Sequence, residues 1–596
     1  MRISAFSEPS CLPGGAGPRT PWRLGAVLAL SVLASCSSVS LAPRPAAAPA
    51  PVVTRPVPAA PPAAAATAPS VAPSAAPASA APAASIPAES PAVAARFPDP
   101  PVSYRTPAFE PGHAGFTSNA ELRSLLHNLV RDGRGASNAS TVKLLQVGSS
   151  QTGVPLEALH FSRAAPPGVR RPAVLLVGQQ HGDEPAGAEA LLVVAQQLAQ
   201  GGLAPLLDQI DVVILPRANP DGAQAERRVT ASGIDPNRDH LLLRTPEAQA
   251  QAQLVREYAP LVVVDAHEYS VLGRYVEKFG AVQRYDALIQ YAMVANLPPL
   301  VTKASEEWFR LPMREKLKAQ GLSSEWYYTN STEPGDRKIS MGGVQPDTSR
   351  NVNGLRHMVS ILIETRGADL GRAHLLRRVH THVTAISSAL TSAAARADDL
   401  QRVRRFVDAD VAAKACQGDV IVEAAATPSE YTLAMLDPQT GADKSVVVSW
   451  DSALVLAPVR KRTRPCGYWL GAGQTDAVLR LRGLGVNVQR IEEGGEMRGE
   501  VYTETGSEIG ARADVRGSIA DGSAGVLRVK VTTAPALIDA VAGSYYVGLD
   551  QPLAALIVAA IEPDTQNSYV SHLIVDNVAA LGRVMHRPTL KTSVVP

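Results

Sequence analysis

Two histidines and two glutamates in this sequence could together form a catalytic metal site. His181 and Glu184 lie three residues apart, His267 follows 83 residues after Glu184, and Glu364 stands in Ile-Leu-Ile-Glu-Thr-Arg. Two imidazoles and one carboxylate leave the fourth position of a tetrahedral zinc ion open, which is typical of catalytic sites. A further carboxylate nearby could take a proton from water. The residue types therefore predict metal-dependent hydrolysis.

Each of these groups follows a short apolar run with the length of a buried strand. Such runs occur at 172–178, 210–216, 261–265 and 358–363, and helical spacing of apolar residues occurs at 120–131 and at about 186–200. Ligands of open α/β sheets gather at the carboxyl ends of the strands. The sequence therefore predicts an α/β domain whose strand ends bring the four groups together.

Residues 118–405 resemble the zinc carboxypeptidases of the carboxypeptidase A superfamily. In that family's pattern His-x-x-Glu and a distant His hold zinc, and these map to His181, Glu184 and His267. Three further motifs match in order and spacing, namely Asn219-Pro-Asp-Gly222, Arg228 with Gly233-Ile-Asp-Pro-Asn-Arg238, and Glu364-Thr-Arg366. The resemblance implies one zinc ion per chain and an α/β fold whose mixed central sheet has helices on both faces.

The resemblance also implies roles for four side chains. Glu364 would activate zinc-bound water, and Arg228 would face the developing oxyanion. Arg238, with Asn237 beside it, would bind the free carboxylate at the end of a peptide, since a guanidinium can do this with two hydrogen bonds. The predicted activity is that of a metallocarboxypeptidase, which hydrolyses the C-terminal residues of peptides.

One feature of the family pattern is missing. The family usually has a Tyr about twenty residues before the catalytic Glu, and residues 338–351 contain none. Tyr327 and Tyr328 are the nearest candidates, whereas Asp347 and Arg350 could shape the specificity pocket instead. The side-chain preference therefore cannot be carried over from the family.

Two other functions fit the same residues. One is a peptidoglycan-peptide carboxypeptidase or amidase that cuts at diaminopimelate or D-amino acids. The other is a non-catalytic binding lipoprotein that has kept the fold without turnover. A net charge of +2 and 5% aromatic residues give no indication of nucleic-acid binding.

The N-terminal segment has the composition of an export signal. Residues 1–36 contain a short apolar run that ends in Leu-Ala-Ser-Cys, which resembles the bacterial lipobox. A lipidated Cys36 would anchor the protein, with a periplasmic or cell-envelope location and the outer membrane as the expected site. An ordinary cleaved signal is the alternative. Residues 37–117, rich in Ala and Pro, are expected to form a disordered tether.

The C-terminal third has a different pattern. Residues 406–596 show short alternating runs separated by Gly, Pro and Asp, which predict a mostly-β domain of unknown role. The apolar run at 552–561 is expected to pack on a partner surface. Cys416 and Cys466 would either pair in an oxidising compartment or remain free.

Overall fold

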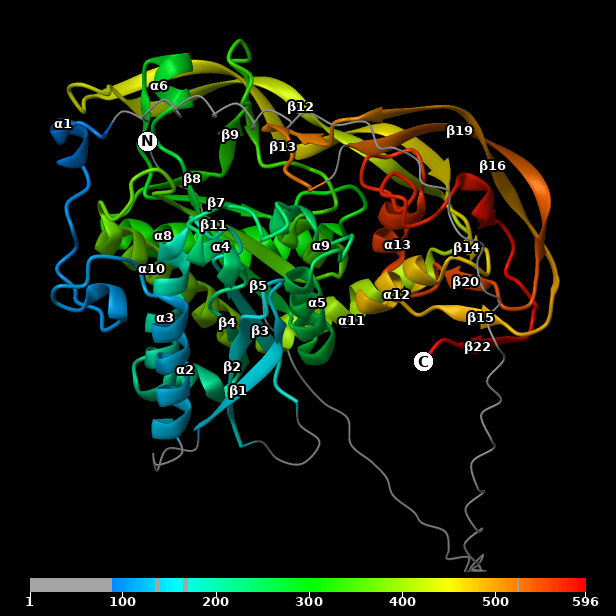
Figure 1. Cartoon of the computed structure of the whole chain (residues 1–596), viewed down its shortest axis with the longest axis horizontal. Helices are drawn as coiled ribbons and strands as arrows, with labels where there is room; N and C mark the ends of the chain where they lie inside the picture. Colours follow the sequence, from blue (N-terminus) through cyan, green and yellow to red (C-terminus); the bar gives the residue numbers. More distant parts are fainter. Residues whose placement is uncertain (1–87, 134–139, 165–169, 523–524) are drawn as a thin grey trace, which may run out of the picture. The chain divides into compact units, whose positions relative to one another are not determined.

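The structure is a computed structural model that describes residues 88–133, 140–164, 170–522 and 525–596 (Figure 1). The predicted signal, Cys36 and most of the predicted tether lie outside these ranges. All the described residues belong to one compact unit. None of the helices in these ranges is long and apolar enough to cross a membrane.

An eight-stranded mixed sheet forms the centre of the α/β region, as predicted. Its strands, in sheet order, are β1 (Ser140–Ser149), β2 (Pro155–Arg163), β4 (Asp211–Leu215), β3 (Ala173–Gly178), β5 (Val262–Tyr269), β11 (Val359–Arg366), β7 (Ala287–Tyr291) and β8 (Ser324–Trp326). The four central strands run parallel to one another, and β11 pairs antiparallel with β7. Every residue of β3, β5 and β11 is buried, which explains why these strands are continuous apolar runs rather than alternating ones.

Helices cover both faces of this sheet (Figure 1). Successive side chains of a strand point to opposite faces, so Leu176 packs in the cluster that includes α2, α3 and α10, while Leu175 packs with α5. The helices of this region are α2 (Asn119–Gly133), α3 (Pro185–Gln200), α4 (Pro220–Gln224), α5 (Pro246–Tyr258), α6 (Arg274–Phe279), α7 (Pro299–Ala304), α8 (Leu311–Ala319), α9 (Ser349–Leu355), α10 (Leu375–Ala395) and α11 (Ala397–Ala413). Both faces are therefore shielded from water.

The strands that carry His267 and Glu364 are longer than the sequence predicted. The apolar runs suggested that β5 ends at Asp265 and β11 at Ile363, whereas the strands continue to Tyr269 and Arg366. Backbone pairing of β5 with β11 continues through these polar residues. Both functional groups consequently sit within rigid strands rather than in the loops that follow.

Part of the predicted tether is instead packed on the α/β region. Within residues 88–117, α1 (Pro91–Ala94) and the short helix η1 (Pro107–Phe109) contribute buried side chains. Glu89 accepts a hydrogen bond from Arg366 at 2.9 Å, and the Arg366 guanidinium lies 3.5 Å from the centre of the Phe97 ring. This corrects the predicted tether for residues 88–117, because Phe97 and Glu89 supply specific contacts that an Ala/Pro-rich composition conceals.

The C-terminal region is rich in β-structure, as predicted, and shares a sheet with the α/β region. A five-stranded sheet has the order β6 (Val282–Gln283), β12 (Asp419–Leu436), β13 (Asp443–Thr463), β10 (Ile339–Met341) and β9 (Tyr328–Asn330). The predicted domain boundary after residue 405 also falls inside α11. The two predicted domains are thus joined by backbone hydrogen bonds as well as by side-chain packing.

A second, seven-stranded sheet lies wholly in the C-terminal region. Its strands, in order, are β19 (Val526–Ala540), β16 (Gly495–Gly510), β21 (Leu581–Val584), β14 (Gly467–Leu470), β20 (Tyr545–Gly548), β15 (Gln489–Ile491) and β22 (Thr592–Val594). Helices α12 (Thr475–Gly483) and α13 (Ala554–Ile561) accompany it, and a separate small hairpin joins β17 (Ala513–Asp514) to β18 (Gly517–Ser518). Helix α13 is apolar and buried almost throughout. It belongs to the interior of this chain, so the expectation of a partner surface there was wrong.

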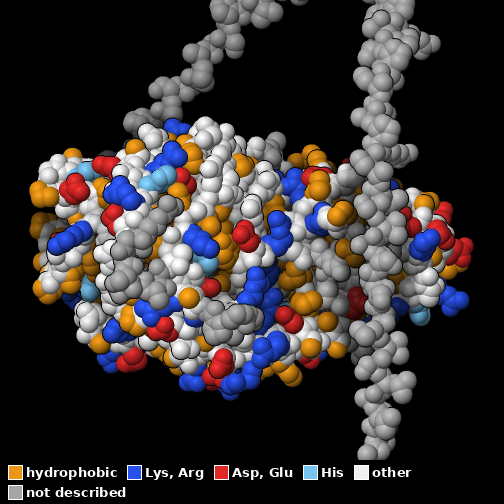
Figure 2. Space-filling view, turned by 90° about the horizontal axis from the view of Figure 1, so that it is seen from below, with side chains coloured by type: hydrophobic (Ala, Val, Ile, Leu, Met, Phe, Trp, Pro, Cys, Tyr) orange, Lys and Arg blue, Asp and Glu red, His pale blue; other side chains and the backbone are white. Residues whose placement is uncertain are grey.

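The outer surface carries no dominant charge on the face that Figure 2 shows. Lys and Arg side chains are interspersed with Asp and Glu side chains and with hydrophobic ones. This mixture agrees with the small net charge of +2.

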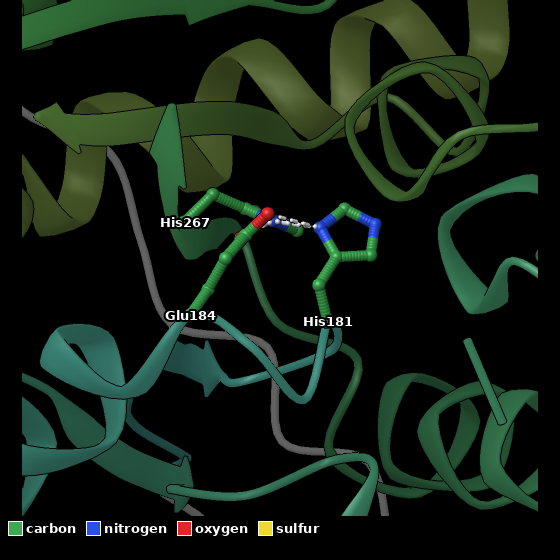
Figure 3. Close-up of side chains that lie close together, drawn as sticks. All are labelled: His181, Glu184 and His267. Carbon is green, nitrogen blue, oxygen red and sulfur yellow. Dashed lines mark hydrogen bonds and ion pairs between the residues drawn. The ribbon is translucent and has the colours of Figure 1, made fainter. Parts of the chain in front are cut away.

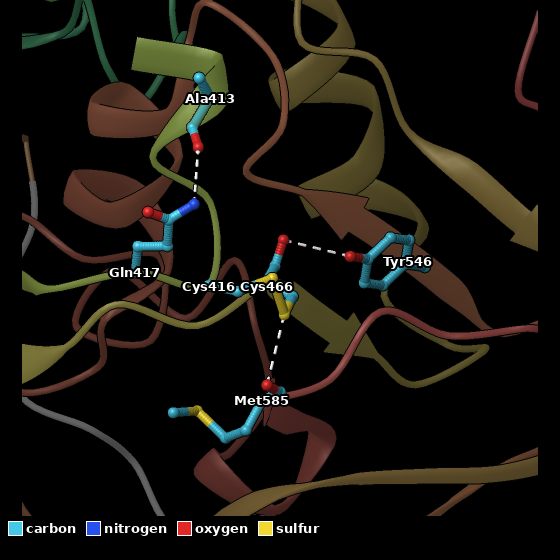
Figure 4. Close-up of a disulfide and its surroundings, with 6 residues drawn as sticks. All are labelled: Ala413, Cys416, Gln417, Cys466, Tyr546 and Met585. Carbon is cyan, nitrogen blue, oxygen red and sulfur yellow. Dashed lines mark hydrogen bonds between the residues drawn. A yellow bond between two sulfur atoms is a disulfide. The ribbon is translucent and has the colours of Figure 1, made fainter. Parts of the chain in front are cut away.

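Cys416 and Cys466 form a disulfide, the first of the two possibilities that the sequence left open (Figure 4). It links the turn after α11 to the start of β14. The backbone carbonyl of Cys466 also accepts a hydrogen bond from the Tyr546 hydroxyl at 3.1 Å. The disulfide therefore ties the C-terminal sheet to the helix that ends the catalytic region.

Replacing both cysteines by serine is expected to destabilise the protein by about 4 kcal/mol, because the disulfide closes a loop of 50 residues in the unfolded chain. Urea unfolding followed by fluorescence should show a lower midpoint for the double variant. Wild-type protein unfolded in the presence of a reductant is the matched control and should show the same shift. Equal midpoints for oxidised and reduced protein would contradict the expectation.

Candidate active site

Three side chains from two segments converge on one point (Figure 3). His181 and Glu184 lie in the turn between β3 and α3, and His267 lies in β5. His181 Nδ1 is 2.7 Å from Glu184 Oε1, and His267 Nδ1 is 2.8 Å from Glu184 Oε2. The two Nδ1 atoms are 3.0 Å apart. The structure thus brings together the three residues that the sequence predicted as metal ligands.

The turn that presents His181 and Glu184 depends on a glycine. A Cβ atom at Gly182 would lie 1.9 Å from the backbone carbon of Gly222. The segment that holds Gly222 is itself fixed by Asn219, whose side chain caps α4 by accepting from the Gly222 amide at 2.9 Å. The His-Gly-Asp-Glu and Asn-Pro-Asp-Gly motifs therefore pack directly against each other at Gly182 and Gly222.

Two aspartates hold the far sides of the imidazoles. Asp265 Oδ1 is 3.0 Å from His267 Nε2, as expected for a carboxylate that orients a ligand, and Asp235 Oδ1 is 3.2 Å from His181 Nε2. Burial opposes ionisation of Asp235, but Arg228 and His181 hold the pKa of that carboxyl well below its usual value. The role of Asp235 was missed, although it stands in the Gly-Ile-Asp-Pro-Asn-Arg motif.

The donor set fits a single small cation. Ligand atoms of His181, Glu184 and His267 all lie within 4.8 Å of one another, and all three residues are buried. Two nitrogens and a carboxylate are the donors that zinc prefers, and three protein ligands are the number found in catalytic zinc sites. The carboxylate also supplies negative charge, which offsets the positive charge of a buried metal ion. Without that offset, burying the ion would be costly.

Glu364 lies beside this cluster. It pairs in register with His267 on the neighbouring strand, and its side chain lines the same cavity as His181 and Glu184. Burial raises the pKa of Glu364 to about 7, and repulsion from Glu184 adds to the effect. A carboxyl group with this pKa can both accept and release a proton near neutral pH.

A cavity of about 280 Å³ opens next to the cluster. It is lined by most of the residues that the sequence singled out, together with arginines from distant segments. Among the lining residues are His181, Glu184, Arg228, Asn237, Arg238, Arg274, Tyr327, Gly342, Gly343, Arg350, Glu364, Asp514 and Arg516. The catalytic and C-terminal regions both contribute to this cavity.

Arg228 lies in contact with the candidate metal ligands. Its Nη1 atom is 3.1 Å from His181 Nδ1 and 3.4 Å from Glu184 Oε1, while its Nε donates to Asp235 Oδ2 at 3.0 Å. The Asp235 carboxylate therefore fixes both the imidazole and the guanidinium. A cation in this position is preorganised to face an oxygen that becomes charged near the metal.

Asn237 and Arg238 line the cavity but already have partners. The Asn237 side-chain oxygen accepts from the Ser349 amide at 2.8 Å. Arg238 forms an ion pair with Asp514 of β17, in which Nε donates to Asp514 Oδ2 at 3.0 Å, and its Nη1 donates to the Asn237 carbonyl at 2.7 Å. A carboxylate from the C-terminal region thus occupies one edge of the guanidinium that the sequence assigned to substrate.

The other pocket candidates separate into two groups. Tyr327, Tyr328 and Arg350 all line the cavity, although Tyr328 is only 1% exposed and also packs in the hydrophobic core. Asp347 is buried and accepts from Arg512 at 2.7 Å and from Asn567 at 2.6 Å. Asp347 therefore anchors the C-terminal region beside the cavity.

Two histidines of α10 lie in the interior of the protein. His380 and His382 are buried, and His382 Nε2 lies 3.1 Å from the carbonyl oxygen of His267. Burial lowers the pKa of His382 to about 3. A neutral His382 therefore donates a hydrogen bond to the backbone of β5 at the candidate ligand His267.

A family model described as zinc carboxypeptidase matches residues 132–369. Residues 132–369 therefore have the sequence pattern of a zinc carboxypeptidase. The enzyme is a metallocarboxypeptidase, and all four groups of the predicted constellation fall within the matched segment. The predicted enzyme class is thereby confirmed, and the predicted zinc carboxypeptidase family is supported.

Fungal carboxypeptidases resemble this enzyme over much of their length. Carboxypeptidase 2 of Trichophyton rubrum is 28% identical over 419 residues, which are 69% of this chain and 75% of that protein. Carboxypeptidase 2 of Trichophyton equinum is 26% identical over 478 residues, or 78% of this chain and 85% of that protein. The second match is too long to fit within residues 1–405, so it extends into the C-terminal region.

Solved structures overlap with a smaller part of the metallocarboxypeptidase. The crystal structure of the carboxypeptidase A from Helicoverpa armigera covers 48% of this chain and 75% of its own, with 15% sequence identity and a TM-score of 0.36.

Proposed function

We propose that this metallocarboxypeptidase removes C-terminal residues from peptides with one zinc ion held by His181, Glu184 and His267. The observation that carries the proposal is the buried cluster of two imidazoles and a carboxylate, with Glu364 in the same cavity. When bound, zinc would act as a Lewis acid and lower the pKa of a water molecule. The remaining chemistry falls to the protein's own side chains.

Glu364 is the proposed general base. In its ionised form it takes a proton from the attacking water and then passes that proton to the amine nitrogen that leaves. Its burial favours the protonated state after the first step, and the nearby Arg228 and imidazoles favour the ionised state before it. Glu364 is thus balanced for both transfers.

Arg228 is the proposed contact to the oxyanion. Asp235 holds its guanidinium, so little reorganisation is needed when negative charge develops. Asn237 and Arg238 remain the proposed contacts to the terminal carboxylate. Because Asp514 already accepts from Arg238, the substrate carboxylate would have to share this guanidinium.

The proposed substrate is an ordinary peptide. The curated relatives carry the name carboxypeptidase 2, which gives no support to a diaminopimelate or D-amino acid substrate. Three of the four predicted groups line one cavity, and the fourth, His267, contacts two of them, which argues against a protein that only binds. Export, lipidation at Cys36 and an envelope location are further proposals that rest on the sequence of residues 1–36.

A C-terminal peptide-library digest read by mass spectrometry tests this function. Purified protein with zinc should shorten linear peptides by one residue at a time, and a chelator should abolish release until zinc is restored. Peptides with an amidated C-terminus and isolated muropeptides are the matched controls and should remain intact. Release from muropeptides but not from linear peptides would contradict the proposal, as would release that survives the chelator.

A further inference from the structure

Five arginines line the cavity beside the metal ligands, and only two of them form ion pairs with carboxylates of the described residues. Arg228 is paired with Asp235, and Arg238 is paired with Asp514. The other three arginines that line the cavity form no ion pair with any carboxylate in the described part of the chain; these are Arg274, Arg350 and Arg516. A cluster of unpaired cations in a binding cavity indicates an anionic ligand.

Arg350 is the most informative of these cations because it is buried. It is 4% exposed, its Nη2 donates to the Gly343 carbonyl at 2.7 Å, and its Nε has no hydrogen-bond partner among the residues that the structure describes. Burial and the neighbouring Arg238 lower the pKa of Arg350 to about 10, so it remains charged at neutral pH. A buried charge without a counter-ion is costly, and a carboxylate from the substrate would remove that cost.

The loop around Gly342 holds this guanidinium in place. A Cβ atom at Gly342 would lie 2.6 Å from Arg350 Nη2 and 2.7 Å from a ring carbon of Tyr327. A glycine is therefore needed for the loop to lie against both side chains. Arg350 is consequently fixed in the wall of the cavity rather than free to move to solvent.

The C-terminal region supplies a second cation. Arg516 lies in the turn between β17 and β18, and its backbone amide donates to Asp514 at 2.7 Å, while its carbonyl accepts from the Thr332 amide at 2.8 Å. Two contacts thus fasten the hairpin to the catalytic region, namely the ion pair of Asp514 with Arg238 and the hydrogen bond from the Thr332 amide to the Arg516 carbonyl. Burial lowers the pKa of Arg274, and repulsion from the nearby Arg516 adds to this effect.

We infer that the enzyme selects peptides whose C-terminal residue has a carboxylate side chain, Glu or Asp. Arg350 forms the ion pair with that side chain, and Arg516 contributes a second positive charge from the C-terminal hairpin. The terminal carboxylate itself goes to the region of Asn237 and Arg238. This specificity rests on the proposed carboxypeptidase function and names its substrate class.

Peptides that differ in one C-terminal residue test the specificity. Wild-type zinc-loaded enzyme should hydrolyse a C-terminal Glu peptide with a kcat/KM at least about tenfold higher than the matching Gln peptide, because one charge-assisted interaction is lost. Free glutamate should likewise inhibit more strongly than free glutamine. In Arg350→Gln both ratios should fall close to one, while a C-terminal Leu peptide is cleaved within a few-fold of wild type.

Arg516→Gln provides a second variant, because Arg516 is partly exposed and its replacement should leave folding intact. It should lower the Glu-to-Gln ratio as well, mainly through KM. Arg405→Gln removes an exposed arginine of α11 and is the matched control, whose ratio should equal that of wild type. Circular dichroism and gel filtration verify the fold of each variant.

The possible outcomes separate the two proposals. If wild type cleaves Glu and Gln peptides equally, or if Arg350→Gln lowers cleavage of all peptides by the same factor, the specificity is overturned and the carboxypeptidase function stands. If the Arg350→Gln protein is misfolded, the Arg516→Gln variant decides. A Glu-to-Gln ratio of kcat/KM for that variant equal to the wild-type ratio overturns the specificity. If wild type cleaves no linear peptide, both proposals fall.

Discussion

Replacing Glu364 by Gln should lower kcat for peptide hydrolysis by about 10²–10⁴-fold, the usual contribution of a positioned general base. The amide keeps the size of the carboxyl group but cannot accept the proton of water. Because Glu364 is not one of the three candidate ligands, zinc content measured by mass spectrometry should stay close to one per chain. The measurement is single-turnover hydrolysis of a peptide with zinc in excess.

Glu508→Gln is the matched control for this variant. Glu508 is an exposed glutamate of β16, so the same chemical change there should leave kcat unaltered. Turnover by Glu364→Gln close to the wild-type rate, with the metal in place, would assign the base to another group. Loss of the metal together with activity would instead show that Glu364 helps to bind it.

Replacing Glu184 by Gln should weaken zinc binding by more than about 100-fold, because even the loss of a group that only orients a ligand costs about 10–100-fold. Within the described ranges, Glu184 is the one carboxylate that contacts both ligand imidazoles. The neutral amide cannot offset the charge of the metal in a buried site. Calorimetric titration of zinc into chelator-treated protein measures the change directly.

Thermal unfolding with and without zinc gives an independent test of the same residue. Zinc binds the folded state, so it should raise the melting temperature of wild type but not of Glu184→Gln. Glu257→Gln, an exposed change on α5, should behave as wild type does. Equal zinc affinity for Glu184→Gln and wild type would exclude the proposed ligand set.

The C-terminal region contributes to the cavity through two ion pairs. Asp514 pairs with Arg238, and Arg512 donates to the buried Asp347. Both pairs bring together segments that lie more than 160 residues apart in the chain. The C-terminal region therefore shapes the site that the catalytic region builds.

Several elements could be predicted from the sequence because their signals are local. The apolar run of β3 followed by His181 and Glu184 indicated a buried strand that ends at a functional turn, and the structure has that arrangement. Residues 88–117 were not predicted correctly, since their contacts are made with residues far along the chain, such as Glu189 with Thr117 and Arg366 with Glu89.

The sequence by itself determined the family, the order of the central strands along the chain and the donors that could hold a metal. These features depend on residue type and short spacing, which can be read from the sequence without knowledge of the fold. The tertiary structure decided which charges are paired. Asp514 forms an ion pair with Arg238, whereas Arg350 is buried and has no carboxylate partner among the described residues. Ion pairing depends on distances of a few ångströms between residues far apart in the chain, and those distances exist only once the chain has folded.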